Sequence, residues 1–249
     1  LLPFVNQRQV QLVEKWIVKN YMVRPISFEE TKPFILEIHY AKRMPSLTFK
    51  FGLFKKDGVG LKTTQLDLFS EESLVGMVSY GSPPSPSLCK GVCGSEFKDQ
   101  VLELNRLVLK DNLKNECSFL IAQSLKLLPK PLIIVSYADT SQKHSGIVYQ
   151  ATNFIYTGLS DKRTEWRMKN SDLHSKTICE KYSLKERKDK PDIFYLINRP
   201  RKHRYIYFLG SKTQKKIYKK NLKYLVKPYE KENLWKLNPL PPLNAKSLG

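Results

Sequence analysis

The sequence of 249 residues has few cysteines and no long apolar run. Its four cysteines are too few for a disulfide scaffold. Cys89 and Cys93 lack a second ligand pair at zinc spacing, so a structural metal is not expected there. No segment is long and apolar enough to span a bilayer, and the first residues lack the basic and apolar regions of a secretory signal. These absences predict a protein of a reducing cytoplasm without a membrane partner.

Acidic residues are also scarce, since 23 Asp and Glu face 43 Lys and Arg, a net charge of +20. Residues 181–249 alone contain 19 basic and 5 acidic residues. Lipidation motifs are missing, so a polyanion, and above all nucleic acid, is the favoured partner; the alternative is a basic face that only meets solvent. We expect phosphates to be contacted by two basic clusters among aromatic residues, namely Arg199, Arg201, Lys202, Arg204, Lys215, Lys216, Lys219 and Lys220.

The hydrophobic pattern predicts an α/β fold with a mixed central sheet flanked by helices. An amphipathic helix is expected at residues 7–20, and Pro33 opens a second helix that ends at His39 and Tyr40. A strand, a loop without glycine, a helix and a strand follow as a βαβ unit with parallel strands. The expected strands are residues 21–26, 47–55, 74–80, 101–109 and 132–137, with the loop at 110–115 and the helix at 116–128.

The chain changes character after the βαβ unit. A helix capped by Thr140 or Ser141 is expected to carry His144 and Tyr149 and to end near Gly158. We expect a loop-rich connection at 161–190, strands at 193–197 and 204–209, a basic helix or turn at 212–224 and an extended tail from residue 228. The chain is therefore divided into a catalytic domain, residues 1–160, and a basic extension, residues 161–249, that packs on it and binds the nucleic acid.

The stretch 136–154 contains the residues best suited to chemistry. A buried strand leads directly into Asp139, and ligands of open α/β sheets bind where strands end. Asp139 and His39 are the best candidates for a base, with His144 as an alternative, and Tyr40 and Tyr149 are candidates for orienting groups. The alternative is structural: Asp139 caps a helix and Tyr149 packs under the sheet.

Antiparallel strands followed by β–loop–α–β–α, with the run YQATNF at 149–154, resemble the acyl-CoA-dependent N-acyltransferase superfamily (GNAT). The resemblance implies that acetyl-CoA or a related acyl-CoA binds where a helix N-terminus offers free amides to its pyrophosphate. The loop KDNLKNECS departs from the superfamily pattern because it has no glycine. The positions implied for the cofactor are Arg106, Leu107, Val108, Asn115 and Ser118.

Five runs in order together resemble the phage Mom family of DNA-modification proteins: residues 39–45, 78–86, 103–108, 136–139 and 149–154. The resemblance implies an enzyme, acting in the cytoplasm of the bacterial host, that converts adenine in double-stranded DNA to its N6-methylcarbamoyl form and so protects the DNA from restriction. It carries over His39, Tyr40, Asp139 and Tyr149 as the catalytic group and as ligands of a bound iron.

The chemistry of adenine sets the requirements for such a site. Its exocyclic amine is a poor nucleophile, so a base and a reactive carbon must be held close to it. The adenine itself must also leave the duplex, and Tyr80 and Tyr137 are candidates for stacking with the extruded adenine ring. Two alternatives stay open: a GNAT enzyme acting on a protein, tRNA or small-molecule amine, and a non-catalytic DNA-binding protein on a former enzyme scaffold.

Overall fold

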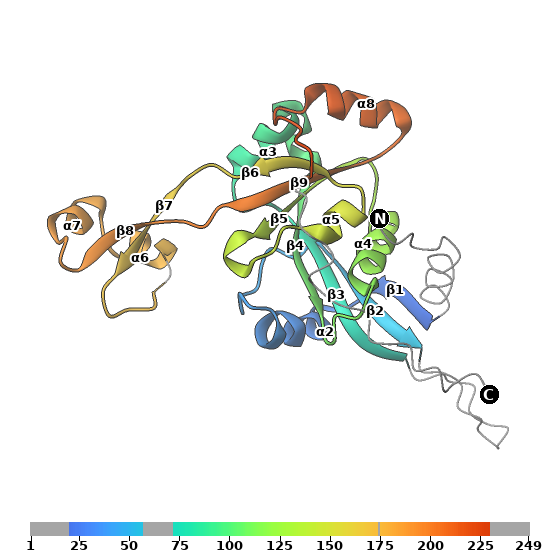
Figure 1. The fold of residues 1–249 in the computed structure, drawn as a ribbon, viewed down its shortest axis with the longest axis horizontal. Coiled ribbons are helices and arrows are strands. Elements are labelled where there is room, and N and C mark those ends of the chain that lie inside the picture. Colours follow the sequence, from blue (N-terminus) through green and yellow to red (C-terminus); the bar gives the residue numbers. More distant parts are fainter. Residues whose placement is uncertain (1–19, 57–71, 174, 230–249) are drawn as a thin grey trace, which may run out of the picture.

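A seven-stranded mixed sheet with the strand order β1-β2-β3-β4-β5-β9-β6 forms the centre of the computed structural model (Figure 1). The structure describes residues 20–56, 72–173 and 175–229; nearly all of the helix expected at 7–20 and the tail beyond residue 229 lie outside them. The strands of this sheet are β1 (Tyr21–Pro25), β2 (Phe49–Lys56), β3 (Glu72–Gly81), β4 (Val101–Leu109), β5 (Leu132–Asp139), β6 (Ile155–Leu159) and β9 (Lys202–Leu209).

The order of the strands confirms the expected fold class. Strands β1 to β4 are antiparallel neighbours, β4 and β5 are parallel, and β9 pairs antiparallel with both β5 and β6. The helix α4 (Glu116–Leu127) joins β4 to β5, as the βαβ pattern predicted. This succession of antiparallel strands and a β–loop–α–β unit is the arrangement that the GNAT resemblance implied.

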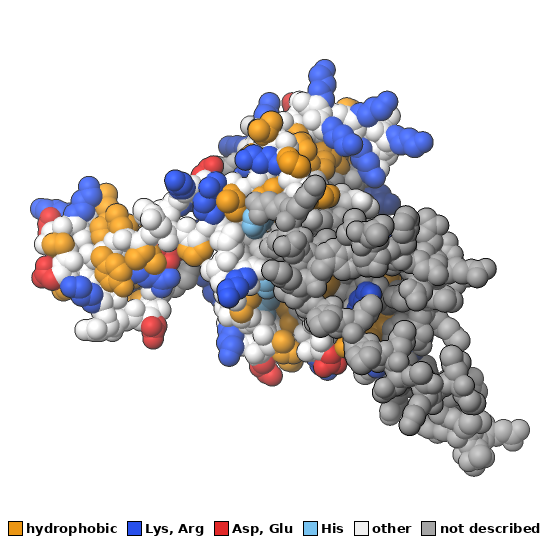
Figure 2. Space-filling view, viewed as in Figure 1, with side chains coloured by type: hydrophobic (Ala, Val, Ile, Leu, Met, Phe, Trp, Pro, Cys, Tyr) orange, Lys and Arg blue, Asp and Glu red, His pale blue; other side chains and the backbone are white. Residues whose placement is uncertain are grey.

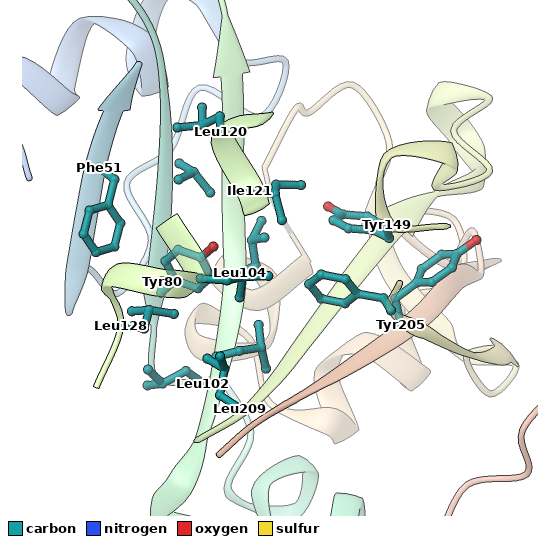
Figure 3. Packing of buried hydrophobic residues seen from close by; sticks show 14 of the residues in the cluster. Phe51, Tyr80, Leu102, Leu104, Leu120, Ile121, Leu128, Tyr149, Tyr205 and Leu209 are labelled. Carbon is teal, nitrogen blue, oxygen red and sulfur yellow. The ribbon is translucent and has the colours of Figure 1, made fainter. Parts of the chain in front are cut away.

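Side chains alternate along the strands, and the buried apolar residues form three clusters, two of which lie on opposite faces of the sheet around β5. On one face Ile134 of β5 packs with Ile121 of α4 and with Tyr149, in a cluster that also contains Tyr80 and Tyr205 (Figure 3). The other face carries a second cluster, built from Ile133 and Val135 of β5, Ile206 and Phe208 of β9, Val92 of α3 (Pro86–Cys93) and Tyr218 of α8 (Lys212–Asn221). The sheet therefore separates an α4 face from an α3–α8 face.

The second helix does not begin where we expected it. It starts at Phe28 as α2 (Phe28–Pro33), because Ser27 and Glu30 form a capping box, and Pro33 lies inside it. A π-helical turn, η1 (Phe34–Ile38), follows and ends at His39. The proline signal was therefore outweighed by the Ser-x-x-Glu signal that begins six residues earlier, at Ser27, and the expected end of the helix at His39 is confirmed.

The segment after β5 is also less helical than expected. A 3-10 turn, η3 (Thr140–Gln142), is capped by Asp139, and the helix α5 (Ile147–Ala151) is short. His144 lies in the loop between them, and Gly158 belongs to strand β6, not to a helix end. Asp139, and not Thr140 or Ser141 as expected, provides the cap.

The connection expected to be rich in loops is a small lobe at one end of the molecule (Figure 1). It consists of the antiparallel pair β7 (Thr164–Met168) and β8 (Phe194–Asn198) and of α6 (Ser175–Lys181) and α7 (Leu184–Asp189). The Arg187 guanidinium lies 5.1 Å from the ring of Trp166 and ties α7 to β7. We call residues 160–163 and 199–201, which join this lobe to the sheet, the neck.

After the neck the chain returns to the sheet. Strand β9 lies between β5 and β6, and α8 covers the second core through the buried Tyr218. The expected strands at 193–197 and 204–209 and the basic helix at 212–224 are thus confirmed. The division of the chain near residue 160 stays a prediction, with the qualification that the later part supplies an inner strand of the main sheet.

Candidate active site

Strands β4 and β5 move apart at the centre of the sheet. Their parallel pairing runs from Val101 opposite Ile133 to Leu104 opposite Ser136, and no further pair between them follows in the described chain. Strand β4 continues to Leu109 along β3, while β5 continues to Asp139 along β9. A gap therefore opens between the two strands, and functional side chains surround it.

His39 and Tyr40 reach this gap from the end of η1. Their rings stack with centroids 4.4 Å apart, and Nδ1 of His39 accepts a hydrogen bond from the amide of Ala41 at 3.0 Å. Burial lowers the pKa of His39 to about 4, and the nearby positive charges of Arg106, His144 and Lys202 add to this. The imidazole is therefore neutral at pH 7.

Asp139 is held by a bond network at the end of β5. Its carboxylate forms an ion pair with Nζ of Lys202 at 2.9 Å and accepts hydrogen bonds from the amide and hydroxyl of Ser141 at 3.0 and 2.7 Å. Burial opposes ionisation, but the bonds from Ser141 and Lys202 outweigh it and lower the pKa of Asp139. Asp139 is thus a weak base that fixes Lys202.

Tyr149 lies on the other face of the sheet, in the α4-side core (Figure 3). Burial raises its pKa to about 12 against a hydrogen bond with Ser136, and the charges of Cys117, Tyr40 and Glu103 also act on it. Asp139 pairs in register with Lys202 and so faces the α3–α8 side. The four residues therefore approach the gap from both faces, and direct contact joins only His39 with Tyr40 among the described interactions.

Glu103 was not among the predicted site residues. It lies in β4 where the pairing with β5 ends, and burial raises its pKa to about 6 although Lys202 and Arg106 lower it. A carboxyl with a pKa close to neutrality is the best matched proton acceptor of this site. The one sequence signal was an acid within the apolar run VLELNRLVL; Lys202, whose charge acts on it, comes from a strand about a hundred residues later.

The residues expected at the cofactor are close to the gap, but several are engaged. Arg106 donates to the carbonyl oxygens of Asn105 and Arg43 at 2.6 and 2.7 Å, while its Nε is buried without a partner in the described structure. Ser118 donates to the carbonyl of Asn115, the residue before α4, at 3.0 Å. Leu107 and Val108 point into apolar cores, so only their backbone is left for a ligand.

The first residue of α4 is an acid, Glu116. Glu116 accepts a hydrogen bond from the amide of Leu113 at 2.8 Å and another from the hydroxyl of Tyr21 at 2.6 Å. One amide of the glycine-free loop is therefore already bonded, and the acid adds negative charge where a pyrophosphate was expected. Glu116 therefore opposes the binding of a pyrophosphate at this end of α4.

The arrangement of His39, Tyr40, Asp139 and Tyr149 does not fit the iron site that the resemblance implied. Asp139 already bonds Lys202 and Ser141, and Tyr149 is approached from the opposite face. Across residues 20–56, 72–173 and 175–229, no group of three or more His, Cys, Asp and Glu lies together as a metal site.

A cavity of about 410 Å³ opens on the α3–α8 side, between the neck and the sheet. Of the predicted phosphate-binding residues, Arg199, Lys202 and Arg204 line it, whereas Arg201 bonds the carbonyl oxygens of Ser160 and Leu159. Its full lining is Pro84, Ser85, Ser87, Leu88, Glu103, Tyr137, Ser160, Asp161, Arg163, Arg199, Pro200, Lys202, Arg204 and Tyr224.

The remaining predicted nucleic-acid contacts are on α8, whose basic side chains cluster at the surface (Figure 2). We call Lys215, Lys216, Lys219 and Lys220 the α8 lysines. Of the two tyrosines expected to stack with a base, Tyr80 is fully buried and bonded to Ser124, so that assignment was wrong; Tyr137 lines the cavity.

The fold and the site define a GNAT-like α/β protein with a gap between its central parallel strands and a basic cavity beside it. The chain belongs to the Mom protein family, whose model matches residues 20–231. It is 26% identical over 225 residues, 86% of this chain and 85% of the relative, to the methylcarbamoylase mom of Escherichia phage Mu. No helix among the described residues is long and apolar enough to cross a membrane.

Among solved structures, the chain is similar to a GNAT-family acetyltransferase of Bacillus cereus, with 12% identity, a TM-score of 0.37 and coverage of 77% of this chain and 99% of that chain. It is also similar to yncA of Salmonella typhimurium, solved with its cofactor acetyl-CoA, with 10% identity, a TM-score of 0.39 and coverage of 77% and 95%.

Proposed function

We propose that the protein is a phage DNA-modification transferase that converts adenine to its N6-methylcarbamoyl form in the host cell. Membership of the Mom family over residues 20–231 is the observation that carries this proposal. The phage Mu relative is named a methylcarbamoylase, and methylcarbamoyl is the group that we expect on N6. The basic cavity and the α8 lysines support double-stranded DNA as the substrate, since both suit phosphate.

The chemistry that we propose centres on the gap between β4 and β5. The N6 nitrogen attacks the reactive carbon of the donor, the bond from that carbon to its leaving group breaks, and one N6 proton passes to a base. Glu103, with a pKa of about 6, is ionised at neutral pH and basic enough to accept it. His39 is neutral but a weaker base, because its pKa is about 4.

Positioning falls to the other residues of the site. Asp139 fixes Lys202, whose charge acts on both Glu103 and His39. Tyr149 and Tyr40 reach the gap from the faces of the sheet and are suited to orient the donor. Acyl-CoA fits the gap as the donor or its precursor, because backbone groups of β4 beyond Leu104 do not pair with β5 and Nε of Arg106 lacks a partner in the described structure.

The test is expression of the chain with a plasmid in bacteria, followed by digestion of the DNA to nucleosides and mass spectrometry. We expect a modified adenine with the wild type and none with Asp139→Ala. Glu96→Gln, an exposed glutamate in η2 (Ser95–Gln100), serves as the matched control and should leave the yield unchanged. Unmodified DNA from folded wild type, with acetylated protein, tRNA or small amines instead, would assign the chain to another GNAT activity.

A further inference from the structure

We propose that the cavity of about 410 Å³ beside the neck receives an adenine nucleotide extruded from the duplex. This inference rests on the proposed function and names the place where its substrate is held. The volume lies within the range of about 300–1,000 Å³ that is typical of small-ligand pockets. An enzyme acting on N6 must take the base out of the stack, so it needs a pocket of this kind.

The charge of the cavity suits a phosphorylated ligand. Four basic side chains line it, Arg163, Arg199, Lys202 and Arg204, against the two acids Glu103 and Asp161. Two of these cations come from the neck and two from β9, so different elements supply the positive charge of the lining. These four cations can bind the phosphates on either side of an extruded nucleotide.

Aromatic side chains form one wall. Tyr137 of β5 and Tyr224, which follows α8, both line the cavity. The Arg204 guanidinium lies 3.4 Å from the centre of the Tyr224 ring, and it also bonds Thr157 through Nε at 3.0 Å. Arg204 thus covers one face of the Tyr224 ring and holds the ring in place, and a flat base can gain stacking energy on the other face and on Tyr137.

Glu103 connects the cavity with the gap between β4 and β5. It lines the cavity and also stands where β4 and β5 separate, so a base in the cavity lies beside the gap. A carboxylate accepts hydrogen bonds from an amine and offers none in return, which favours the exocyclic amine of adenine over a carbonyl edge. The same residue then both selects the amine and takes its proton.

The nucleotide of acyl-CoA is the other ligand with this chemistry. The residues implied for the cofactor, Ser118 and Asn115, belong to the start of α4, which packs on the opposite face of the sheet. The cavity instead adjoins the second core, through Leu88, Tyr137 and Tyr224. Donor and acceptor would therefore reach the gap from opposite faces.

The experiment measures affinity for two duplexes without any acyl donor. One is fully paired, and the other has a single adenine opposite an abasic site, which removes most of the cost of extrusion. We expect wild type to prefer the second duplex about tenfold or more. Tyr224→Ala should abolish the preference but keep the affinity for the paired duplex within about twofold, since stacking is lost and the α8 lysines remain.

Matched variants distinguish an effect of the cavity from a general loss of folding or of DNA affinity. Leu88→Trp, which fills the cavity, should also abolish the preference, and Tyr195→Ala on the lobe, where Tyr195 is 43% exposed, should retain it. Thermal unfolding of each variant verifies that it is folded. Binding of acetyl-CoA, measured by calorimetry, should be unchanged in Tyr224→Ala.

Two results would overturn the inference while the proposed function stands. One is a wild type that modifies DNA but shows no preference, or a preference that persists in both cavity variants. The other is loss of acetyl-CoA binding in those variants, which would make the cavity the nucleotide site of the cofactor. A wild type that binds neither duplex and modifies no plasmid refutes the proposed function itself.

Discussion

Replacing Glu103 by glutamine should stabilise the protein while it abolishes modification. Burial raises the pKa of this carboxyl from 4.5 to about 6, so the folded protein binds its proton more tightly than the unfolded chain does. At 1.36 kcal/mol for each pKa unit, keeping Glu103 ionised in the folded state costs about 2 kcal/mol. Glutamine carries no charge and avoids this cost.

The direction of the pKa shift of Glu103 determines the pH range in which the variant is more stable than the wild type. Because the pKa of Glu103 is raised in the folded state, the contribution of its protonated form to stability is fully present below pH 4.5. This contribution is lost as the pH rises through 6. The difference in free energy of unfolding between Glu103→Gln and wild type should therefore be near zero at pH 4 and about 2 kcal/mol in favour of the variant at pH 7.5. Other groups titrate equally in both proteins and cancel.

Urea unfolding across this pH range measures the difference, and the yield of modified adenine from plasmid measures activity. We expect the yield to fall about 10²–10⁴-fold, as is usual when a general base is removed. Glu96→Gln, which is exposed, should change stability by no more than about 0.5 kcal/mol at any pH. A stability difference for Glu103→Gln that does not vary with pH would refute the raised pKa of this carboxyl, and full activity would refute its role as the base.

Three further predictions concern the site and its DNA contacts. The rate of modification of bound duplex, measured in single turnovers, should fall below about pH 6 as Glu103 takes up a proton, while His39 with its pKa of about 4 stays neutral; a rate that is flat down to pH 5 contradicts this. Changing the four α8 lysines to glutamine should reduce the slope of log K for DNA binding against log salt by about 3.6, or about 0.9 for each lysine. The control Lys126→Gln with Lys130→Gln, in α4 and just after it, should leave the slope unchanged. Tyr149→Phe should lower the rate at least about tenfold with a loss of stability near 1 kcal/mol, because Ser136 keeps its bond to the Leu104 carbonyl; equal rates would make Tyr149 a packing residue.

The sequence by itself determined most of the elements and the family. The strand at 101–109, the helix that begins at Glu116 and the strand that begins at Leu132 have strong local signals, apolar runs bounded by polar loops, and the structure has them almost residue for residue. The order of these elements is enough to predict the parallel pair β4–β5. The ordered motifs were enough to place the chain in the Mom family, because they do not depend on contacts.

The tertiary structure decided how the site is assembled. The pKa of Glu103 depends on burial and on Lys202, which the placement of β9 next to β5 brings within reach of it. The same register pairs Asp139 with Lys202 and turns it away from the face that Tyr149 occupies. Burial and long-range charge pairing arise only when strands distant in sequence become neighbours, so no local pattern in the sequence carries them.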